Sequence, residues 1–289
     1  MDRRSVLVFS AAALAGCTLN PDFDYSGPTA PRTQPLPGPV RVAWVLSSGG
    51  PRGFVHVGVL KALERLGLQP DLIVGASVGA LVGSLRAAGM RATAIESLAL
   101  ELQPASLARL AVGAGERLSG SAIADLVRQH APVTLLEQMP VAMACVAARR
   151  RDGAAFAFTA GDAGVAVQAA AAIEGQFAPV RIRGEHYRDA DWTMPLPARI
   201  ARALGAQRVL AVDASVHVDR SPAGAGRYRD ADLRKKALVD ADAVTADLLL
   251  KPDFGYWVNL SREFRERAID AGYRATMASE AELRALHSA

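Results

Sequence analysis

A serine set between two glycines is the residue of this sequence best placed for covalent chemistry. Ser77 is the central residue of the run G-A-S-V-G at residues 75–79. The mostly apolar residues 71–74 predict a buried strand before it, and a helical pattern begins at Ala80. A strand, a sharp turn and a helix in this order form a nucleophile elbow, which makes Ser77 the candidate nucleophile. The alternative is structural, with glycines that allow close helix–strand packing and a serine that caps the helix.

A glycine-rich loop at residues 48–53, S-G-G-P-R-G, precedes the elbow. It follows a predicted strand at residues 40–46 and enters a predicted helix, where free backbone amides favour negative charge. We therefore expect the amides of Gly49, Gly50 and Val78 to form an oxyanion hole. The loop lacks the Lys-Ser or Lys-Thr of a phosphate-binding loop and the spacing G-x-G-x-x-G, so nucleotide binding is not expected.

Two longer segments carry a family resemblance. They read S-G-G-P-R-G-F-V-H-V-G-V-L-K-A-L-E-R-L-G at residues 48–67 and P-D-L-I-V-G-A-S-V-G-A-L-V-G at residues 70–83. Both resemble the core of bacterial patatin-like phospholipases, and the resemblance extends over about residues 41–213. It implies a patatin-like or lysophospholipase-like α/β fold, a three-layer α/β/α arrangement with a mainly parallel central sheet. It also implies a serine acyl hydrolase that cleaves carboxylic esters of phospholipids or related lipids.

The resemblance also assigns the catalytic base. The family has a D-G-G or D-G-A motif whose aspartate completes a Ser-Asp dyad, and this chain has Asp189-Ala190-Asp191 at that place, with Pro197 eight residues after the first aspartate. Asp189 is therefore the expected base for Ser77, and the resemblance implies neither a metal nor a cofactor.

Two departures from the family pattern concern this machinery. Ser48 replaces the leading glycine of the loop and would be strained if its φ angle were positive. The second departure is D-A-D, in which Ala190 loses the backbone freedom of glycine. Asp191 places a second carboxylate near Asp189, and their repulsion would raise one pKa, which either tunes the base or impairs it.

Supporting and rival residues accompany the dyad. We assign supporting roles to Asp191 and to Arg52, which either holds a phosphate or carboxylate of the substrate or pairs with a loop carboxylate. A rival Ser-Asp-His triad would use His217. His56 is expected to be a packed or polar helix residue with a supporting role near the loop. Three further histidines are expected at the surface: His130, His186 and His287.

The first residues resemble an export signal. Arg3 and Arg4 precede a short apolar run that ends in L-A-G-C, with Cys17 last, so residues 1–16 are expected to be a cleaved signal peptide. L-A-G-C resembles the lipobox of bacterial lipoproteins, which implies a lipid anchor on Cys17. Thr18 then favours the outer membrane of a Gram-negative envelope, and the membrane and its lipids become the expected partners. The alternative is that Cys17 is an ordinary cysteine after the signal peptide. Arg3 and Arg4 also resemble a twin-arginine export signal, but that signal is incomplete.

The remaining chain divides into a tether and a domain. Six prolines lie within residues 17–39, which predict a tether. Residues 40–289 are expected to form the patatin-like domain, with a core at 40–213 and a C-terminal helical part at 214–289. Within the core, residues 141–147 and 154–159 flank a turn and predict a β-hairpin.

Composition limits the remaining functional classes. Hydrophobic residues make up 51% of the 289 residues and the formal net charge is +4, so the chain is globular and lacks the dense basic cluster that nucleic acid requires. Phe254, Tyr256 and Trp257 either cover an acyl chain or pack in the core. The D-A-D segment also keeps open a second function, in which a catalytically silent lipoprotein of the same fold binds lipid or scaffolds envelope partners.

Overall fold

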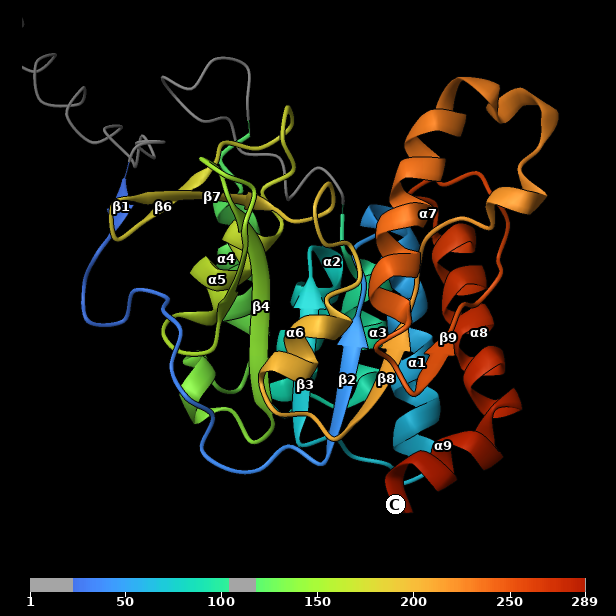
Figure 1. The fold of residues 1–289 in the computed structure, drawn as a ribbon, viewed down its shortest axis with the longest axis horizontal. Helices are drawn as coiled ribbons and strands as arrows, with labels where there is room; N and C mark the ends of the chain where they lie inside the picture. The colour runs from blue at the N-terminus through green and yellow to red at the C-terminus, as the bar shows by residue number, and fades with distance from the viewer. Residues whose placement is uncertain (1–22, 104–117, 289) are drawn as a thin grey trace, which may run out of the picture.

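The computed structural model describes residues 23–103 and 118–288, and their central feature is a twisted β-sheet (Figure 1). Its strands are β1 Asp24–Tyr25, β2 Val42–Leu46, β3 Leu72–Ala76, β4 Ala142–Arg149, β5 Ala155–Phe158, β6 Val180–Ile182, β7 Glu185–Asp189, β8 Arg208–Val212 and β9 Leu248–Leu250. The helices are α1 Phe54–Arg65, α2 Val78–Ala87, α3 Ala92–Glu101, α4 Ser121–His130, α5 Ala163–Ala170, α6 Ala198–Ala203, α7 Arg229–Ala243, α8 Arg262–Ala278 and α9 Glu280–Ser288.

The sheet is mainly parallel, as the sequence predicted. Its strand order is β1-β6-β7-β4-β3-β2-β8-β9, and β5 pairs with β4 beside this path. Strands β4, β3, β2, β8 and β9 are parallel, whereas β7 and β5 are antiparallel to β4. The pairing of β4 with β5 confirms the predicted hairpin. Because β4, β3 and β2 run in the same direction, the residues that follow them gather at one edge of the sheet.

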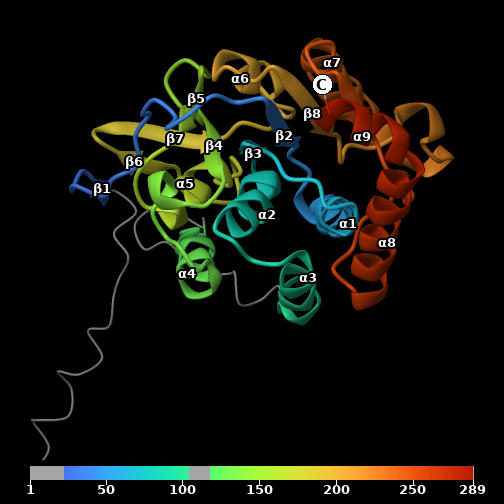
Figure 2. The ribbon, with the colours of Figure 1, turned by 90° about the horizontal axis from the view of Figure 1, so that it is seen from below.

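Helices cover both faces of the sheet, which confirms the expected three-layer arrangement. Seen from below, α1 to α5 lie on one side of the strands and α6 and α7 on the other (Figure 2). Alternate residues of β2 enter two separate cores: Trp44 packs with the α1–α5 layer and Val45 with the α6–α7 layer. Burial on both faces explains why the central strands read as continuous apolar runs.

The C-terminal part contributes to the same core. Strand β9 extends the sheet beside β8, so residues 214–289 include a strand as well as the expected helices. Helix α8 lies along α1, and two glycines allow the close approach. A Cβ atom on Gly58 would lie 1.8 Å from the Ile269 carbonyl oxygen, and one on Gly272 would lie 2.1 Å from that of Val55.

The segment predicted as a tether differs from expectation where the structure describes it. Residues 23–39 are bound to the domain: β1 pairs with β6, and the Arg32 amide donates to the Ala160 carbonyl oxygen at 2.9 Å. The Thr33 hydroxyl also donates to the Ala157 carbonyl oxygen at 2.7 Å. Prolines remove amide donors but leave carbonyls and flanking residues free to bind, so this part of the chain is not a free spacer. Cys17 and residues 1–16 lie outside the described residues.

Within the described ranges, none of the helices combines the length and apolar character needed to cross a membrane.

Candidate active site

Ser77 stands at a strained turn between β3 and α2. Its φ and ψ angles are 53° and −124°, a conformation that costs a non-glycine residue about 1–3 kcal/mol. Two glycines make the turn possible, because a Cβ atom on Gly75 would lie 2.4 Å from the Gly79 carbonyl oxygen, and one on Gly79 would lie 2.2 Å from that of Leu46. The Ser77 side chain makes no capping hydrogen bond to α2. The strain therefore serves to present the hydroxyl rather than to cap the helix.

Strand register brings Asp189 level with Ser77. In the sheet, Ala76 of β3 lies opposite Val146 of β4, and Ala147 of β4 lies opposite Asp189 of β7. Ser77, one residue beyond Ala76, is therefore level with Asp189 across Ala147. Two strand spacings, about 10 Å, separate the two backbones.

The Asp189 carboxyl group is buried, with only 3% of the residue exposed. Its pKa is raised from 3.8 to about 7, with burial as the largest cause; the Ser77 hydroxyl lowers this pKa and the charge of Asp191 raises it. One oxygen, Oδ1, accepts the Asp191 amide at 2.8 Å. Among the described residues Oδ2 has no hydrogen-bond partner, and the Ser77 hydroxyl, although near enough to affect the pKa, lacks the geometry of a formed hydrogen bond to it. Oδ2 is thus the oxygen free to receive a proton.

The two departures from the family pattern contact each other. The Ser48 hydroxyl donates to Asp191 Oδ1, which also accepts the Lys235 ammonium group of α7 at 2.6 Å. The expected strain is absent, since neither Ser48 nor Ala190 has a positive φ angle; Gly50 has, at 53°. The expected effect of Asp191 on the pKa of Asp189 is present, second in size to burial among the causes that raise it.

The glycine loop meets the elbow at a shared pocket. Gly50, Ser77 and Val78 all line it. In the described structure, no protein acceptor receives the amides of Gly50 or Val78, because each begins a helical turn. The amide of Gly49 also has no protein acceptor in the described structure, but Gly49 is not among the residues that line the pocket. A Cβ atom on Gly49 would lie 3.2 Å from the Cβ atom of Ala214. Two of the three residues expected to supply oxyanion amides therefore line the same pocket as Ser77.

The pocket that contains Ser77 is apolar and has a volume of about 430 Å³. It lies among α1, α2, α3 and α4, and leads away from the elbow. Its lining consists mostly of aliphatic side chains and includes Val57, Leu81, Ile95, Leu98, Ile123 and Leu126. A cavity of this size and lining accommodates a hydrocarbon chain.

Arg52 differs from both sequence interpretations. Its Nε donates to the Ala214 carbonyl oxygen at 2.7 Å, and its Nη1 donates to the carbonyl oxygens of Gly255 at 2.9 Å and Tyr256 at 3.2 Å. The guanidinium also lies over the Phe254 ring, 4.2 Å from the ring centroid, and burial lowers its pKa to about 10. Arg52 thus holds the loop against two later segments, and forms no ion pair within the described chain.

The histidines take the following places. His56 is fully buried in α1, its Nε2 hydrogen-bonds the Ser47 carbonyl oxygen at 2.9 Å, and burial lowers its pKa to about 4, so it supports the start of the glycine loop in neutral form. No hydrogen bond in the described structure joins His217 to Ser77 or Asp189, which gives the rival triad no support. His287 is half-buried rather than superficial, because its Nε2 accepts the Trp44 indole at 3.1 Å.

Of the three aromatic residues considered as an acyl cover, none lines the pocket. Phe254 is buried and packs on Phe264, with ring centroids 5.9 Å apart. Tyr256 donates its hydroxyl to Asp232 at 2.5 Å, and Trp257 is 51% exposed. The prediction of core packing is thus correct for Phe254 and wrong for the other two residues.

Lys235 and Ala147 were not predicted from the sequence. Lys235 lies in a strongly charged helix whose pattern does not distinguish one lysine from its neighbours, and Ala147 gains importance only through strand register. Neither residue carries a sequence signal that points to the site.

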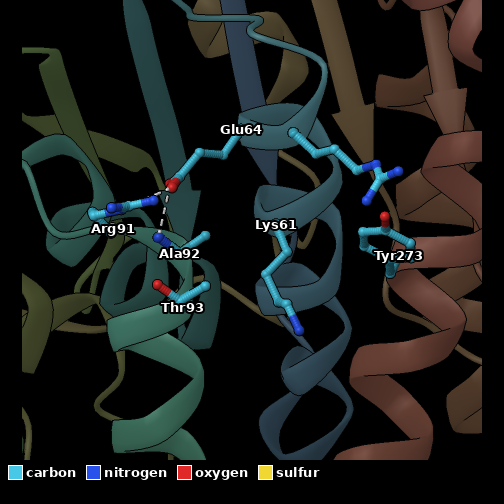
Figure 3. A pocket seen from close by; sticks show the side chains of 7 residues that line it. Lys61, Glu64, Arg91, Ala92, Thr93 and Tyr273 are labelled. Atoms are coloured by element: carbon cyan, nitrogen blue, oxygen red, sulfur yellow. Dashed lines mark hydrogen bonds and ion pairs between the residues drawn. The ribbon is translucent and has the colours of Figure 1, made fainter.

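A second cavity of about 420 Å³ lies between α1, α3 and α8, away from Ser77 (Figure 3). Its charged lining residues serve the fold. Glu64 accepts the Ala92 amide at 2.8 Å and Arg91 Nε at 3.3 Å, and Lys61 pairs with Glu96 at 2.6 Å. These bonds fasten the start of α3 to α1.

A serine elbow after a central parallel strand, a glycine loop with free amides and a buried carboxylate are the arrangement of the α/β serine-hydrolase class. The family model described as patatin-like phospholipase matches residues 44–202, and the chain belongs to this family.

Relatives in sequence agree with this assignment, and a solved structure has a similar fold. An uncharacterized NTE family protein of Mycobacterium tuberculosis is 33% identical over 195 residues, which is 66% of this chain and 52% of that protein. Human patatin-like phospholipase domain-containing protein 6 is 30% identical over 182 residues, 60% of this chain and 13% of its own. The crystal structure of VipD from Legionella pneumophila has a similar fold, with a TM-score of 0.59 and 16% identity over 85% of this chain and 67% of that one. The match thus spans about half of the mycobacterial relative.

Proposed function

We propose that this protein hydrolyses carboxylic esters of phospholipids or related lipids, with Ser77 as nucleophile and Asp189 as base. The observation that carries the proposal is the meeting of three groups: a strained serine hydroxyl, a buried carboxylate with one unpartnered oxygen, and an apolar pocket of about 430 Å³ that begins at the serine. Family membership supports the same class of reaction.

The reaction proceeds through an acyl-enzyme. Ser77 Oγ attacks the ester carbonyl carbon while its proton passes to Asp189 Oδ2, and the carbonyl oxygen, now negative, accepts the amides of Gly50 and Val78. The tetrahedral intermediate collapses, the carbon–oxygen bond to the alcohol breaks, and the alcohol leaves with the proton from Asp189. Water then repeats the sequence in place of Ser77 and releases the fatty acid.

A fluorophosphonate probe and an ester assay on the full chain test this proposal. Labelling at Ser77 is expected, and Ser77→Ala is expected to abolish labelling and to lower ester hydrolysis by at least about 10³-fold, because the nucleophile is gone. Asp189→Asn is expected to lower hydrolysis similarly. A matched control is Ser84→Ala in α2, whose hydroxyl only bonds the Leu81 carbonyl oxygen at 2.9 Å. Folded protein without labelling or turnover would favour the silent lipid-binding alternative, and hydrolysis retained by Ser77→Ala would refute the mechanism.

We also propose that the protein is held at the bacterial envelope, in the outer membrane, by a lipid on Cys17. The sequence L-A-G-C at residues 14–17 supports this proposal. Radiolabelled palmitate is expected to be incorporated into the expressed chain and not into Cys17→Ser. Equal labelling of both would overturn the anchor without affecting the proposed chemistry.

A further inference from the structure

Four exposed apolar side chains lie on two neighbouring segments. Tyr228, Trp257, Val258 and Leu260 are exposed by 39, 51, 45 and 46%, and we name this set the aromatic rim. The rings of Tyr228 and Trp257 meet edge to face, with centroids 6.2 Å apart, so segments distant in sequence form one surface. Large apolar side chains gathered at a surface indicate a binding function, because their exposure to water is unfavourable.

The aromatic rim is fastened to the glycine loop. Arg52, inside the helical turn Gly50–Gly53, holds the carbonyl oxygens of Gly255 and Tyr256, the two residues before Trp257. The Tyr256 hydroxyl is bound in turn by Asp232 of α7 at 2.5 Å. These bonds fix the position of the rim relative to the loop that carries the Gly50 amide.

The aromatic rim also continues into the apolar pocket. Leu260, its last member, lines the same pocket as Ser77. Leu260, which belongs to both the rim and the pocket, thus connects the exposed surface with the space that holds the candidate nucleophile. Such a path suits a molecule that leaves an apolar phase and enters the pocket without crossing water.

Cationic groups flank the aromatic rim. The Arg227 guanidinium lies 4.6 Å from the centroid of the Tyr228 ring. Arg262, which begins α8 just after Leu260, has an exposed side chain whose Nε also pairs with Glu266 at 2.8 Å. Tryptophan and tyrosine with neighbouring arginines match the boundary between lipid head groups and acyl chains, where aromatic rings and cations each find suitable surroundings.

We propose that the aromatic rim docks on a phospholipid surface, with Trp257 at the level of the head groups, and that a lipid passes from this surface along Leu260 into the pocket. The last step rests on the proposed function, whereas the docking itself does not.

Vesicle binding by a catalytically inactive protein tests the docking. The full chain with Ser77→Ala and Cys17→Ser, which lacks the nucleophile and any acyl anchor, is expected to cosediment with vesicles of phosphatidylcholine and phosphatidylglycerol. Trp257→Ser in this background is expected to lower the partition coefficient about tenfold, and Val258→Ser less, because less apolar area is lost. The matched control is Val244→Ser, 82% exposed at the other end of α7 from Tyr228, which is expected to change nothing. Equal binding by Trp257→Ser and the control would overturn the proposal.

Tryptophan fluorescence locates the contact. The chain has three tryptophans: Trp44 is fully buried, and Trp192 and Trp257 are 53% and 51% exposed. Vesicles are expected to shift the emission to shorter wavelength, and this shift is expected to persist in Trp192→Phe and to vanish in Trp257→Phe. A shift that depends on Trp192 instead would assign docking to another surface.

Two substrates separate docking from catalysis. Trp257→Ser is expected to hydrolyse a soluble short-chain ester within about twofold of the wild-type rate and to lose about tenfold on phospholipid vesicles, in proportion to its binding. Equal loss on both substrates would contradict docking as the role of the rim. If the wild-type chain hydrolyses neither substrate, the proposed function fails, while the sedimentation result still decides the docking.

Discussion

The hydroxyl of Ser48 donates a hydrogen bond to Asp191, so the two residues that depart from the family pattern form one contact between the glycine loop and the loop after Asp189. Lys235 binds the same carboxylate oxygen from α7. A family member with glycine at both positions has no such side-chain contact. The departures are thus paired, and the paired contact joins the two parts of the site.

We predict that Ser48→Ala and Asp191→Ala each lower kcat/KM about tenfold, because either change breaks the same charge-assisted hydrogen bond. The double variant is expected to be little worse than the more severe single variant, since the bond is lost once. Steady-state kinetics on a soluble ester for the four proteins measures this coupling. The control is Thr193→Ala, in the same loop as Asp191, combined with Ser48→Ala; the losses of kcat/KM from these two changes are expected to add. Additive losses in the Ser48 and Asp191 pair would show that their contact is unimportant.

The pH dependence of activity is predicted to follow Asp189. Its pKa is raised from 3.8 to about 7, so the carboxyl is protonated at pH 5 and cannot accept the Ser77 proton. We expect kcat/KM on a soluble ester to rise through about pH 7 and to level off above it.

Two variants move this profile in opposite directions. Asp191→Asn removes a charge that raises the pKa of Asp189, so its profile is expected to shift to lower pH. Lys235→Met removes a charge that lowers this pKa, so its profile is expected to shift to higher pH. Shifts in the same direction, or none, would exclude Asp189 as the group that titrates.

Asp189 is also predicted to limit stability. Its folded-state pKa lies above the unfolded value, so the folded chain binds the extra proton and stability falls as pH rises from about 4 to about 7. The rise in pKa corresponds to at most about 4 kcal/mol of unfolding free energy. We expect Asp189→Asn to be more stable than the wild type by about 1–3 kcal/mol at pH 8, with the difference closing toward pH 5. Denaturant unfolding at both pH values measures it, with the exposed Asp219→Asn as control; a gap independent of pH would contradict the linkage.

Pocket length is predicted to set acyl-chain preference. Ala99 lines the apolar pocket, and Ala99→Trp is expected to fill part of it, so hydrolysis of long-chain esters falls about tenfold relative to short-chain esters. Ala94→Trp, on the exposed side of the same helix, is the matched control and is expected to keep the wild-type ratio. The ratio of kcat/KM values across a series of ester chain lengths provides the measurement. An unchanged ratio in Ala99→Trp would place the acyl chain elsewhere.

Local patterns were sufficient for the elbow and the parallel core. The apolar run before Gly75 and the helical pattern after Gly79 predicted β3 and α2, because burial on both faces demands continuous apolar strands. Strand β7, which carries Asp189, was not predicted, since its sequence E-H-Y-R-D is mostly polar. Asp189 was reached only through family resemblance.

The sequence by itself predicted the turn at Ser77 and the glycine loop, because each depends on residues adjacent in the chain, and family resemblance supplied the three-layer class. Only the tertiary structure decided that Asp189 lies level with Ser77, that Ser48 binds Asp191 and that Arg52 holds backbone carbonyls instead of a carboxylate. These contacts join residues more than one hundred positions apart, and they depend on strand register and helix placement, which are properties of the packed core as a whole.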